Sequence, residues 1–473
     1  MNIVFEDVDR RTRLPWAVVG LLCAAQFMLI LDITVVNVAL PSIQAGIGIA
    51  AADLQWVVTA YTLAFGGLIV LGGRAADLYG RRRMFLTGLA AFTAASLAAA
   101  VASSGPMLIA ARATQGVAAA LLSPAALSLI TTLFPAGPQR HRALAAWAAV
   151  AASGGAVGVL LGGVLTQGLG WRAIFLINVP VGIAVAAAAL WLVPTARPAR
   201  RGRLDAAGAL LATGSLVALI YGLVETGDAG WLSTQTLGRF GLAAAGIAAF
   251  VAVERRHREP LVALSLFRRR PTVVALVLFV VGMGTVFSGF YYSSLYLQQV
   301  LGHSALRTGV EFLPIAVAIL AAAHLGGNLI SRFGAKPVIA TGLVLAAGGA
   351  LLLGGVSPTG SYLTHVLPGF LALGLGGGLA AAGVMITAMS GVGHDDAGAV
   401  SGLTTTAHEL SVALVLPVLA TVAASSATTG PTAGIAAAFR TAAVIAVAGV
   451  ALAVAGLRRG DVEAGAHVPH LVH

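Results

Sequence analysis

The feature that most constrains this chain is a succession of fourteen apolar runs, each about as long as a membrane-crossing helix. A helix that spans the hydrocarbon core of a bilayer needs about 20 apolar residues. Of the 473 residues, 58% are apolar and only 10% are charged, whereas a soluble domain carries roughly 25% charged residues. The chain cannot cover a water-facing surface, and we predict an all-α polytopic membrane protein with fourteen transmembrane helices.

The positive charges predict the orientation of these helices. If the N-terminus is cytoplasmic, 23 of the 28 Arg and Lys residues fall on inner segments, four fall on outer segments, and Arg112 lies within a helix. Inner loops of membrane proteins carry an excess of Arg and Lys, so both termini are expected to be cytoplasmic. The net charge of +11 then reflects orientation and contact with anionic lipid, and we expect no nucleic-acid partner.

Several protein classes are excluded by what the loops lack. The longest polar connection, about 255–271, is too short to fold as a catalytic domain. Lys336 is the only lysine and the sequence contains no GxxxxGK[ST] phosphate-binding loop. The single cysteine, Cys23, forms no internal disulfide and belongs to no Cys/His zinc pattern. We therefore expect no enzyme, no cofactor and no metal site.

An internal repeat points to transport. Glycine, an acidic or hydroxyl residue, glycine and a cation occur at offsets 0, +4, +7 and +9 in two inner loops, at Gly73, Asp77, Gly80 and Arg82 and at Gly327, Ser331, Gly334 and Lys336. The glycines suit tight turns between helices, and repeated halves are common in secondary transporters. A positively charged loop that only sets topology is the alternative.

The repeat predicts the domain organisation. Residues 1–195 would form an N-terminal six-helix half, and 272–457 a C-terminal six-helix half. Residues 196–271 would hold two inserted helices with basic inner loops, and 458–473 a cytoplasmic tail.

Five segments of the first half carry recognisable motifs. They are Leu31 to Pro41, Gln55 to Tyr61, Gly73 to Arg83, Arg112 to Gly116 and Trp171 to Pro180. Together they resemble the major facilitator superfamily, specifically its fourteen-span drug:proton antiporter group (EmrB/QacA-like). The second half matches that group mainly in layout.

The resemblance implies a fold of two six-helix halves plus two central helices, and it implies proton antiport. It makes Asn37, Tyr61 and Gln115 candidate substrate contacts. It also assigns the inner loop to gating, through Gly73, Asp77, Gly80, Arg81 and Arg82. The fifth-helix motif of the group usually reads GxxxGPxxGG, and here Gly154, Gly158, Gly162 and Gly163 keep the close packing of helices while Val159 replaces the proline that would kink the helix.

Charged residues inside the spans are the candidates for proton coupling, because an intramembrane charge is costly unless it is paired, protonated or hydrated. From the helix rise, Asp32 lies roughly 12 Å and Arg112 roughly 9 Å below the outer ends of their helices. The two can therefore pair, either as a proton site tuned by the arginine or as a static ion pair. Glu409, roughly 18 Å deep, is the second candidate, and its neighbour His408 is not expected to share its face.

The other acidic residues near the spans, Glu225, Asp228 and Glu311, lie at outer helix ends, where hydrated surface roles are expected. The ninth helix carries an aromatic stripe. Tyr292, Tyr296 and Gln299 are spaced to share one face, and Phe287, Tyr291, Ser294 and Gln298 an adjacent one. These residues suit a bulky, partly apolar or cationic solute, although an outer aromatic belt also accounts for Tyr296.

We therefore predict a proton-coupled exporter of hydrophobic or amphipathic small molecules such as drugs or antibiotics, working by alternating access and driven by the proton gradient. It would be a monomer in a cell membrane. The 27 arginines against one lysine indicate a GC-rich genome, and therefore a bacterial source. The alternatives are a dedicated exporter of one metabolite, siderophore or lipid, and a non-transporting membrane sensor or scaffold of the same fold.

Overall fold

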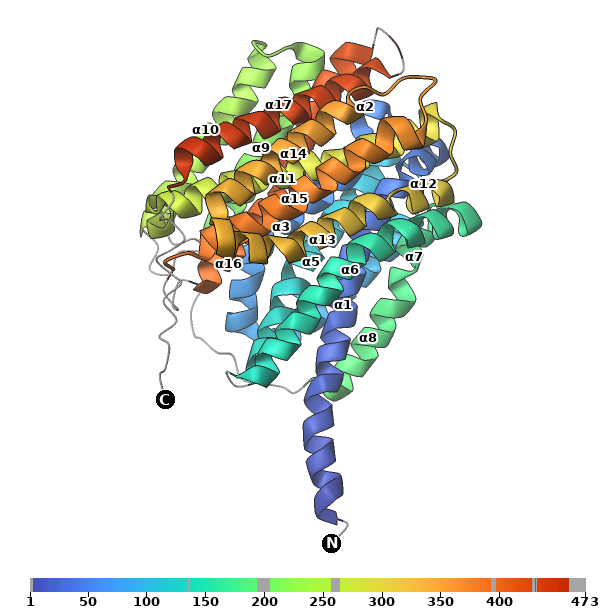
Figure 1. Ribbon diagram of the computed structural model, residues 1–473. Coiled ribbons are helices and arrows are strands. Elements are labelled where there is room, and N and C mark those ends of the chain that lie inside the picture. The colour runs from blue at the N-terminus through green and yellow to red at the C-terminus, as the bar shows by residue number, and fades with distance from the viewer. Residues whose placement is uncertain are drawn as a thin grey trace. The chain divides into compact units, whose positions relative to one another are not determined.

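The computed structural model describes residues 3–134, 137–193, 205–256, 264–392, 397–427, 430 and 432–458. Every secondary-structure element in these ranges is a helix (Figure 1). The first eight are α1 (Ile3–Ile47), α2 (Ala51–Leu54), α3 (Trp56–Tyr79), α4 (Arg81–Ala100), α5 (Gly105–Leu133), α6 (Pro138–Leu169), α7 (Ala173–Leu176) and α8 (Asn178–Leu192).

The remaining helices begin with the pair predicted as an insertion. They are α9 (Ala206–Ala229), α10 (Thr234–Arg256), η1 (Leu264–Arg268), α11 (Arg270–Leu295), η2 (Tyr296–Val300), α12 (Ala305–Glu311), α13 (Leu313–Phe333), α14 (Ala335–Leu353), η3 (Tyr362–Val366), α15 (Leu367–Met389), α16 (Ala397–Ser426) and α17 (Ala433–Gly456). The segment η1 is a 3₁₀-helix, and η2 and η3 are π-helical turns.

The described helices agree with the predicted succession of apolar spans. Thirteen of them are long and apolar enough to cross a bilayer, and Ser153–Leu169 within α6 is a shorter apolar stretch. In hydrocarbon every backbone N–H and C=O must be hydrogen-bonded within the protein, which a helix achieves on its own. The prediction of an all-α polytopic membrane fold is confirmed.

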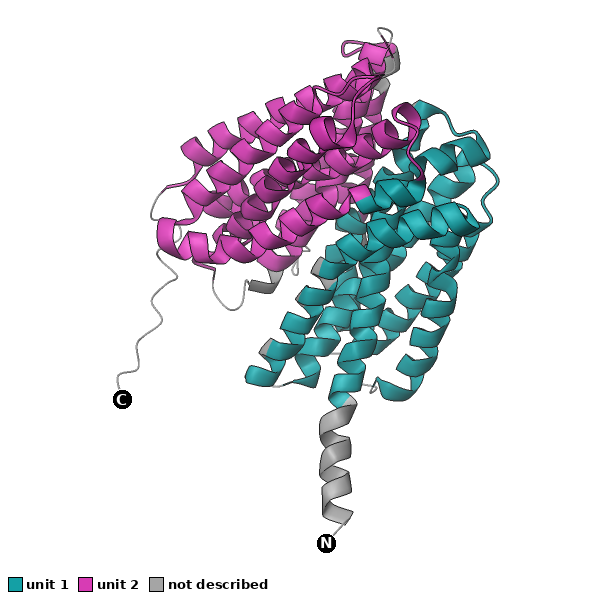
Figure 2. Cartoon of the chain, turned by 45° about the vertical axis from the view of Figure 1, so that its right-hand side comes forward, with its two compact units in different colours: residues 1–209, 305–310 teal, residues 210–304, 311–473 magenta. Residues whose placement is uncertain are grey.

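The chain forms two compact units (Figure 2). Unit 1 comprises residues 1–209 and 305–310, and unit 2 comprises residues 210–304 and 311–473. Most of α9 and all of α10 fall in unit 2, so the predicted boundaries at 195 and 271 remain predictions. The predicted tail lies outside the described residues apart from Arg458.

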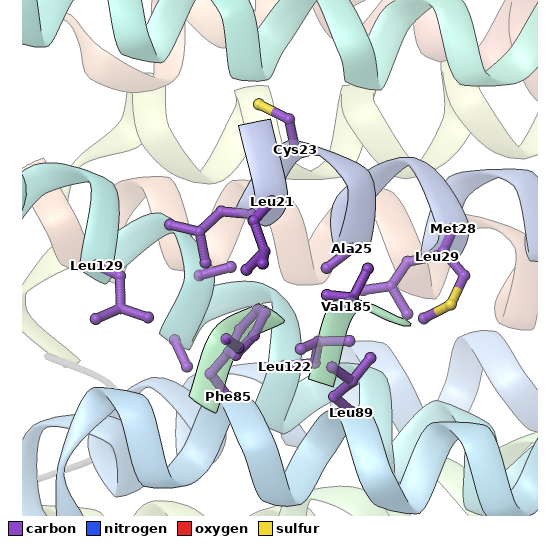
Figure 3. Close-up of a cluster of buried hydrophobic side chains, with 14 of the residues drawn as sticks. Leu21, Cys23, Ala25, Met28, Leu29, Phe85, Leu89, Leu122, Leu129 and Val185 are labelled. Carbon is purple, nitrogen blue, oxygen red and sulfur yellow. The ribbon is translucent and has the colours of Figure 1, made fainter. Parts of the chain in front are cut away.

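A buried apolar cluster packs α1 against its neighbours in unit 1. The side chains labelled in Figure 3 come from α1, α4, α5 and α8 and include Leu21, Leu29, Phe85, Leu89, Leu122 and Val185. These side chains are less than 9% exposed. Their packing positions the part of α1 that carries Asp32.

The tight turns predicted for the repeated loops are present in both units. Gly80 joins α3 to α4 with φ +98°, and Gly334 joins α13 to α14 with φ +83°. A side chain would be strained at these angles. Each glycine N–H also closes the preceding helix by donating to a carbonyl four residues earlier, Ala76 at 3.1 Å and Ile330 at 2.8 Å. The expected turn is therefore present at the second glycine of each copy, whereas Gly73 and Gly327 lie inside α3 and α13.

The glycines of the fifth-span motif bring α6 against α1. A methyl group at Gly154 would lie 2.8 Å from Ile30 Cγ2, one at Gly158 would collide with Thr34, and one at Gly162 would lie 2.9 Å from the Val35 backbone. Gly163 faces α12 instead, where a methyl group would lie 2.7 Å from the Ala305 carbonyl oxygen. Three of the four motif glycines thus face the segment of α1 around Asp32.

We expect Gly158→Ala to destabilise the protein because its new methyl group collides with Thr34. Overpacking of this kind costs about 1–3 kcal/mol. Gly155→Ala is the matched control, since nothing lies within 4 Å of its added methyl group and both variants gain the same helix propensity. Thermal unfolding of the purified proteins in detergent measures the difference. Equal melting temperatures for the two variants would show that α1 and α6 do not need this close approach.

Candidate functional site

Asp32 and Arg112 meet in the interior of unit 1. Arg112 Nη1 donates a hydrogen bond to Asp32 Oδ2 and forms an ion pair with it. The two side chains are 0% and 1% exposed. The pairing expected from their similar depth in α1 and α5 is therefore present.

Several groups hold the Arg112 guanidinium in one orientation. Its Nε donates to the Val57 carbonyl oxygen at 2.9 Å, and its Nη1 also donates to Gln115 Oε1 at 2.9 Å. The Tyr61 ring centre lies 4.4 Å and the Phe175 ring centre 5.7 Å from its Cζ atom, within the range of cation–π attraction. The arginine is therefore bound by backbone, amide and aromatic groups as well as by the carboxylate.

The second carboxylate oxygen of Asp32 accepts two amide hydrogen bonds. Gln115 Nε2 donates to Oδ1 at 3.1 Å and Asn178 Nδ2 donates to it at 2.8 Å. Gln115 Nε2 also donates to Ser96 Oγ at 2.8 Å. We name this buried set of Asp32, Ser96, Arg112, Gln115 and Asn178 the Asp32 network.

Sequence reasoning missed two members of the Asp32 network. Asn178 lies inside the motif from Trp171 to Pro180, so the motif pointed to its segment without indicating a contact to Asp32. Ser96 lies in an alanine-rich stretch of α4 that carries no motif. Both side chains are buried, at 1% and 0% exposed. Their role follows only from where α4 and α8 pass α1.

The electrostatics of the Asp32 network favour one charge of each sign. Among the described residues, Arg112 is the only charged side chain hydrogen-bonded to or ion-paired with Asp32. A buried charge is tolerated when an opposite charge and hydrogen bonds replace its hydration. The balance of charge in the Asp32 network depends on the protonation of Asp32, because proton uptake would leave Arg112 as the only charged member.

The other substrate candidates of unit 1 make mostly internal contacts. Tyr61 is fully buried and lies over Arg112. Asn37, 4% exposed, donates weakly to the Ile33 carbonyl oxygen of its own helix at 3.3 Å. Tyr61 and Gln115 are therefore neighbours of the ion pair, whereas Asn37 lies farther along α1.

In unit 2, Glu409 on α16 is 7% exposed. Its Oε1 lies 3.2 Å from His408 Nδ1, so the two side chains meet although neighbouring residues of a helix do not share a face. Consecutive helical residues point in different directions, but the length of the glutamate side chain allows it to bend back to the imidazole. The Phe279 and Phe287 ring centres each lie 5.6 Å from the His408 ring.

The residues of the predicted aromatic stripe differ in burial and in their contacts. Tyr292 packs against Tyr291 and Phe439, and the Tyr296 hydroxyl donates to the Ser357 carbonyl oxygen at 2.8 Å. All three tyrosines are buried, whereas Gln299 is exposed. Gln299 lies in the π-helical turn η2, which begins at Tyr296, and the shared face of Tyr292, Tyr296 and Gln299 stays a prediction.

The adjacent face is retained. Gln298 Nε2 donates to Ser294 Oγ at 3.1 Å, as expected for residues four apart on a helix. Tyr291, three residues before Ser294, is 4% exposed.

Glu311 is not a hydrated surface residue, contrary to expectation. Its side chain is 8% exposed and its Oε2 lies 2.8 Å from His303 Nδ1. The Tyr362 hydroxyl donates to its backbone oxygen at 2.8 Å. The loop after η2 returns His303 to the end of α12, which a count of residues from the helix end could not show. The side chains of Glu225 and Asp228 lie outside the described part of the chain.

The repeated inner loops make equivalent contacts in the two units. Arg82 Nη2 donates to the Leu190 carbonyl oxygen at 2.7 Å, close to the C-terminus of α8. Lys336 Nζ donates to the Val454 carbonyl oxygen at 2.6 Å, close to the C-terminus of α17. Asp77 forms an ion pair with Arg81 at 3.3 Å within its own loop. The cation at offset +9 thus binds a carbonyl in the last turn of α8 in unit 1 and of α17 in unit 2.

Arg82→Ala and Lys336→Ala should therefore have similar effects. A cation near the C-terminus of a helix neutralises its partial negative charge and binds carbonyls left without partners. We expect each variant to lower stability by about 1 kcal/mol, measured by thermal unfolding in detergent. Arg83→Ala, an exposed neighbour, should change it by less than about 0.5 kcal/mol. A loss in one variant without the other would contradict the equivalence of the two loops.

The described residues show no group of three or more His, Cys, Asp or Glu side chains that could hold a metal ion. The Asp32 network has the chemistry of a buried carboxylate beside a permanent cation.

Comparison with known proteins identifies the family. A sequence model described as Major Facilitator Superfamily matches residues 22–416. The cephamycin export protein CmcT of Amycolatopsis lactamdurans is 41% identical over 415 residues, which cover 87% of this chain and 85% of that protein. The puromycin resistance protein pur8 of Streptomyces alboniger is 40% identical over 412 residues, which cover 86% and 81%.

A solved structure agrees in fold. The crystal structure of the peptide transporter POT in complex with sulfate has a TM-score of 0.68 at 16% identity and covers 93% of this chain and 94% of that one. At that identity the likeness concerns the fold alone. The family match over most of the chain and the two relatives lead to one conclusion: the chain belongs to the major facilitator superfamily, a family of transporters.

Proposed function

We propose that the protein is a proton-coupled exporter, an antiporter of hydrophobic or amphipathic small molecules such as drugs or antibiotics, that works by alternating access of its two six-helix halves. Two relatives named for cephamycin export and puromycin resistance support export of this class of molecule. The observation that carries the proton coupling is the buried ion pair of Asp32 and Arg112.

The Asp32 network explains how a proton can be coupled to a conformational change. With Asp32 ionised, the carboxylate holds Arg112 and the two amides of Gln115 and Asn178. Protonation removes the negative charge, so the attraction that joins α1 to α5 weakens. Release of the proton restores it. The ion pair is thus an element whose strength depends on proton occupancy.

Other residues complete the proposal. Glu409, beside His408, would be a second proton site, and Asn37, Tyr61, Gln115 and the polar and aromatic residues of α11 and η2 would contact substrate. The loop from Gly73 to Arg82 would gate the inner side. The proton gradient would supply the energy, without a cofactor. The carrier would act as a monomer in a bacterial cell membrane with both termini inside, an orientation supported by the 23 to 4 distribution of cations.

A dedicated exporter of one natural product is the second candidate function. The names of both relatives refer to a single compound, cephamycin or puromycin. A dedicated exporter would share the Asp32 network and differ only in the breadth of compounds that it accepts.

Transport by inside-out vesicles tests the proposal. Vesicles containing the full chain should accumulate dyes and drugs when their interior is acidified, and lose them when the gradient is collapsed. Accumulation of a single compound from a broad panel favours the dedicated exporter. Absence of gradient-driven accumulation across the panel, with correctly inserted protein, contradicts the proposed function.

A further inference from the structure

Asn178 occupies a distinctive place in the Asp32 network. It begins α8, directly after the single residue that separates α8 from the short helix α7. Its Nδ2 donates to Asp32 Oδ1 at 2.8 Å, closer than Gln115 at 3.1 Å. It is the member of the network that α8 contributes, and its side chain is 1% exposed. The contact links segments 146 residues apart.

The other end of its carboxamide has no partner. Asn178 Oδ1 is buried and makes no hydrogen bond within the described part of the chain. A buried acceptor without a donor costs free energy. An apolar residue of similar volume would avoid this cost, so the position uses the amide for something beyond packing.

The hydrogen bonds available to an amide depend on the protonation of Asp32. An ionised carboxylate only accepts hydrogen bonds, so the amide must turn Nδ2 toward it, as observed. A protonated carboxyl group also donates one, and an amide rotated by half a turn would accept it with Oδ1. Arg112 carries only donors, so it cannot accept that hydrogen bond.

We propose that Asn178 is a positioning residue that keeps α8 hydrogen-bonded to Asp32 in both protonation states and sets the pH range in which Asp32 exchanges its proton. The inference rests on the proposed function of proton-coupled export. Its hydrogen bond to the ionised carboxylate is charge-assisted and stronger than the one it would accept from the neutral carboxyl group, so loss of both weakens the ionised state more. As an acceptor it lets α8 stay attached when the attraction of Arg112 weakens.

The neighbours of Asp32 decide which groups besides Asn178 can respond to its protonation. Arg112, Gln115 and Asn178 contact the carboxylate directly. Tyr61 of α3 lies beside the guanidinium, and Ser96 of α4 is joined through Gln115. On the side of α6, glycines pack against the residues of α1 that flank Asp32. Of these, Arg112 is charged and Tyr61 is titratable. Asn178 and Gln115 are the neutral donors to the carboxylate.

The test compares pH profiles of transport. In inside-out vesicles at a fixed pH difference, Asn178→Leu, which removes donor and acceptor at similar volume, should move the pH of half-maximal transport upward by about one unit, a tenfold change in proton affinity. Asn178→Ser retains a hydroxyl that donates and accepts, and should return the profile toward that of the wild type. Thr62→Val is the control, since its buried hydroxyl bonds only within α3.

A second measurement does not depend on transport. Infrared titration of the purified protein should show a protonated carboxyl band that Asp32→Asn removes. In Asn178→Leu the midpoint of that band should move to higher pH, even if no substrate is found. A lower transport rate or melting temperature with unchanged midpoints would show that Asn178 only packs α8 against α1 and would overturn the inference. Absence of gradient-driven transport by the wild type would count against the proposed function alone.

Discussion

Asp32→Asn is expected to reduce proton-driven accumulation in inside-out vesicles to the level of vesicles that lack the protein. The asparagine has nearly the same shape as the aspartate, but it leaves the Arg112 charge buried without its partner, so the amount of inserted protein has to be measured. It carries no exchangeable negative charge, so the Asp32 network can no longer change its charge with the proton gradient. The measurement is initial uptake with the interior acidified, normalised to the amount of inserted protein.

Two comparisons make this result specific. Asp53→Asn alters an exposed aspartate on α2 and should leave accumulation unchanged. Exchange of labelled for unlabelled substrate needs no net proton movement, so Asp32→Asn should retain it if the carboxylate serves the proton alone. Wild-type accumulation by Asp32→Asn would remove Asp32 from the mechanism and leave Glu409 as the remaining candidate.

Arg112→Ala is expected to cause the largest loss of stability. It leaves the Asp32 carboxylate buried without its counter-charge and deprives the Val57 carbonyl and Gln115 Oε1 of their donor. Removing one partner of a buried ion pair typically costs about 3–5 kcal/mol. The prediction is a large drop in melting temperature in detergent, whereas Arg83→Ala, at an exposed position, should shift it little.

The double variant Asp32→Asn with Arg112→Gln separates stability from function. Replacing both charges of a buried pair by neutral groups is often close to neutral for stability, so the double variant should recover much of the stability that Arg112→Ala loses. Proton-driven transport should stay absent, because the ionisable carboxylate is missing. Recovery of transport by the double variant would contradict the role assigned to the pair, and failure to recover stability would show that packing around the guanidinium dominates.

The candidate site was partly predictable from the sequence. Counting residues from helix ends placed Asp32 and Arg112 at similar depth, which suffices for a pair on two helices that cross the same bilayer. The same count failed for Glu311, because depth along one helix says nothing about a loop residue such as His303 that returns to meet it. Helical spacing grouped Tyr292 with Gln299, but it could not show that a π-helical turn begins at Tyr296 or that Tyr292 is buried and Gln299 exposed.

The sequence by itself determined the class of the protein, its fourteen spans and its repeated glycine turns. A bilayer demands apolar segments of a set length with internally hydrogen-bonded backbone, and this demand is met residue by residue along the chain. The tertiary structure alone decided that Ser96 and Asn178 join Asp32. Those contacts depend on which faces of α1, α4, α5 and α8 meet, and that is set by packing among apolar and glycine surfaces far apart in the sequence.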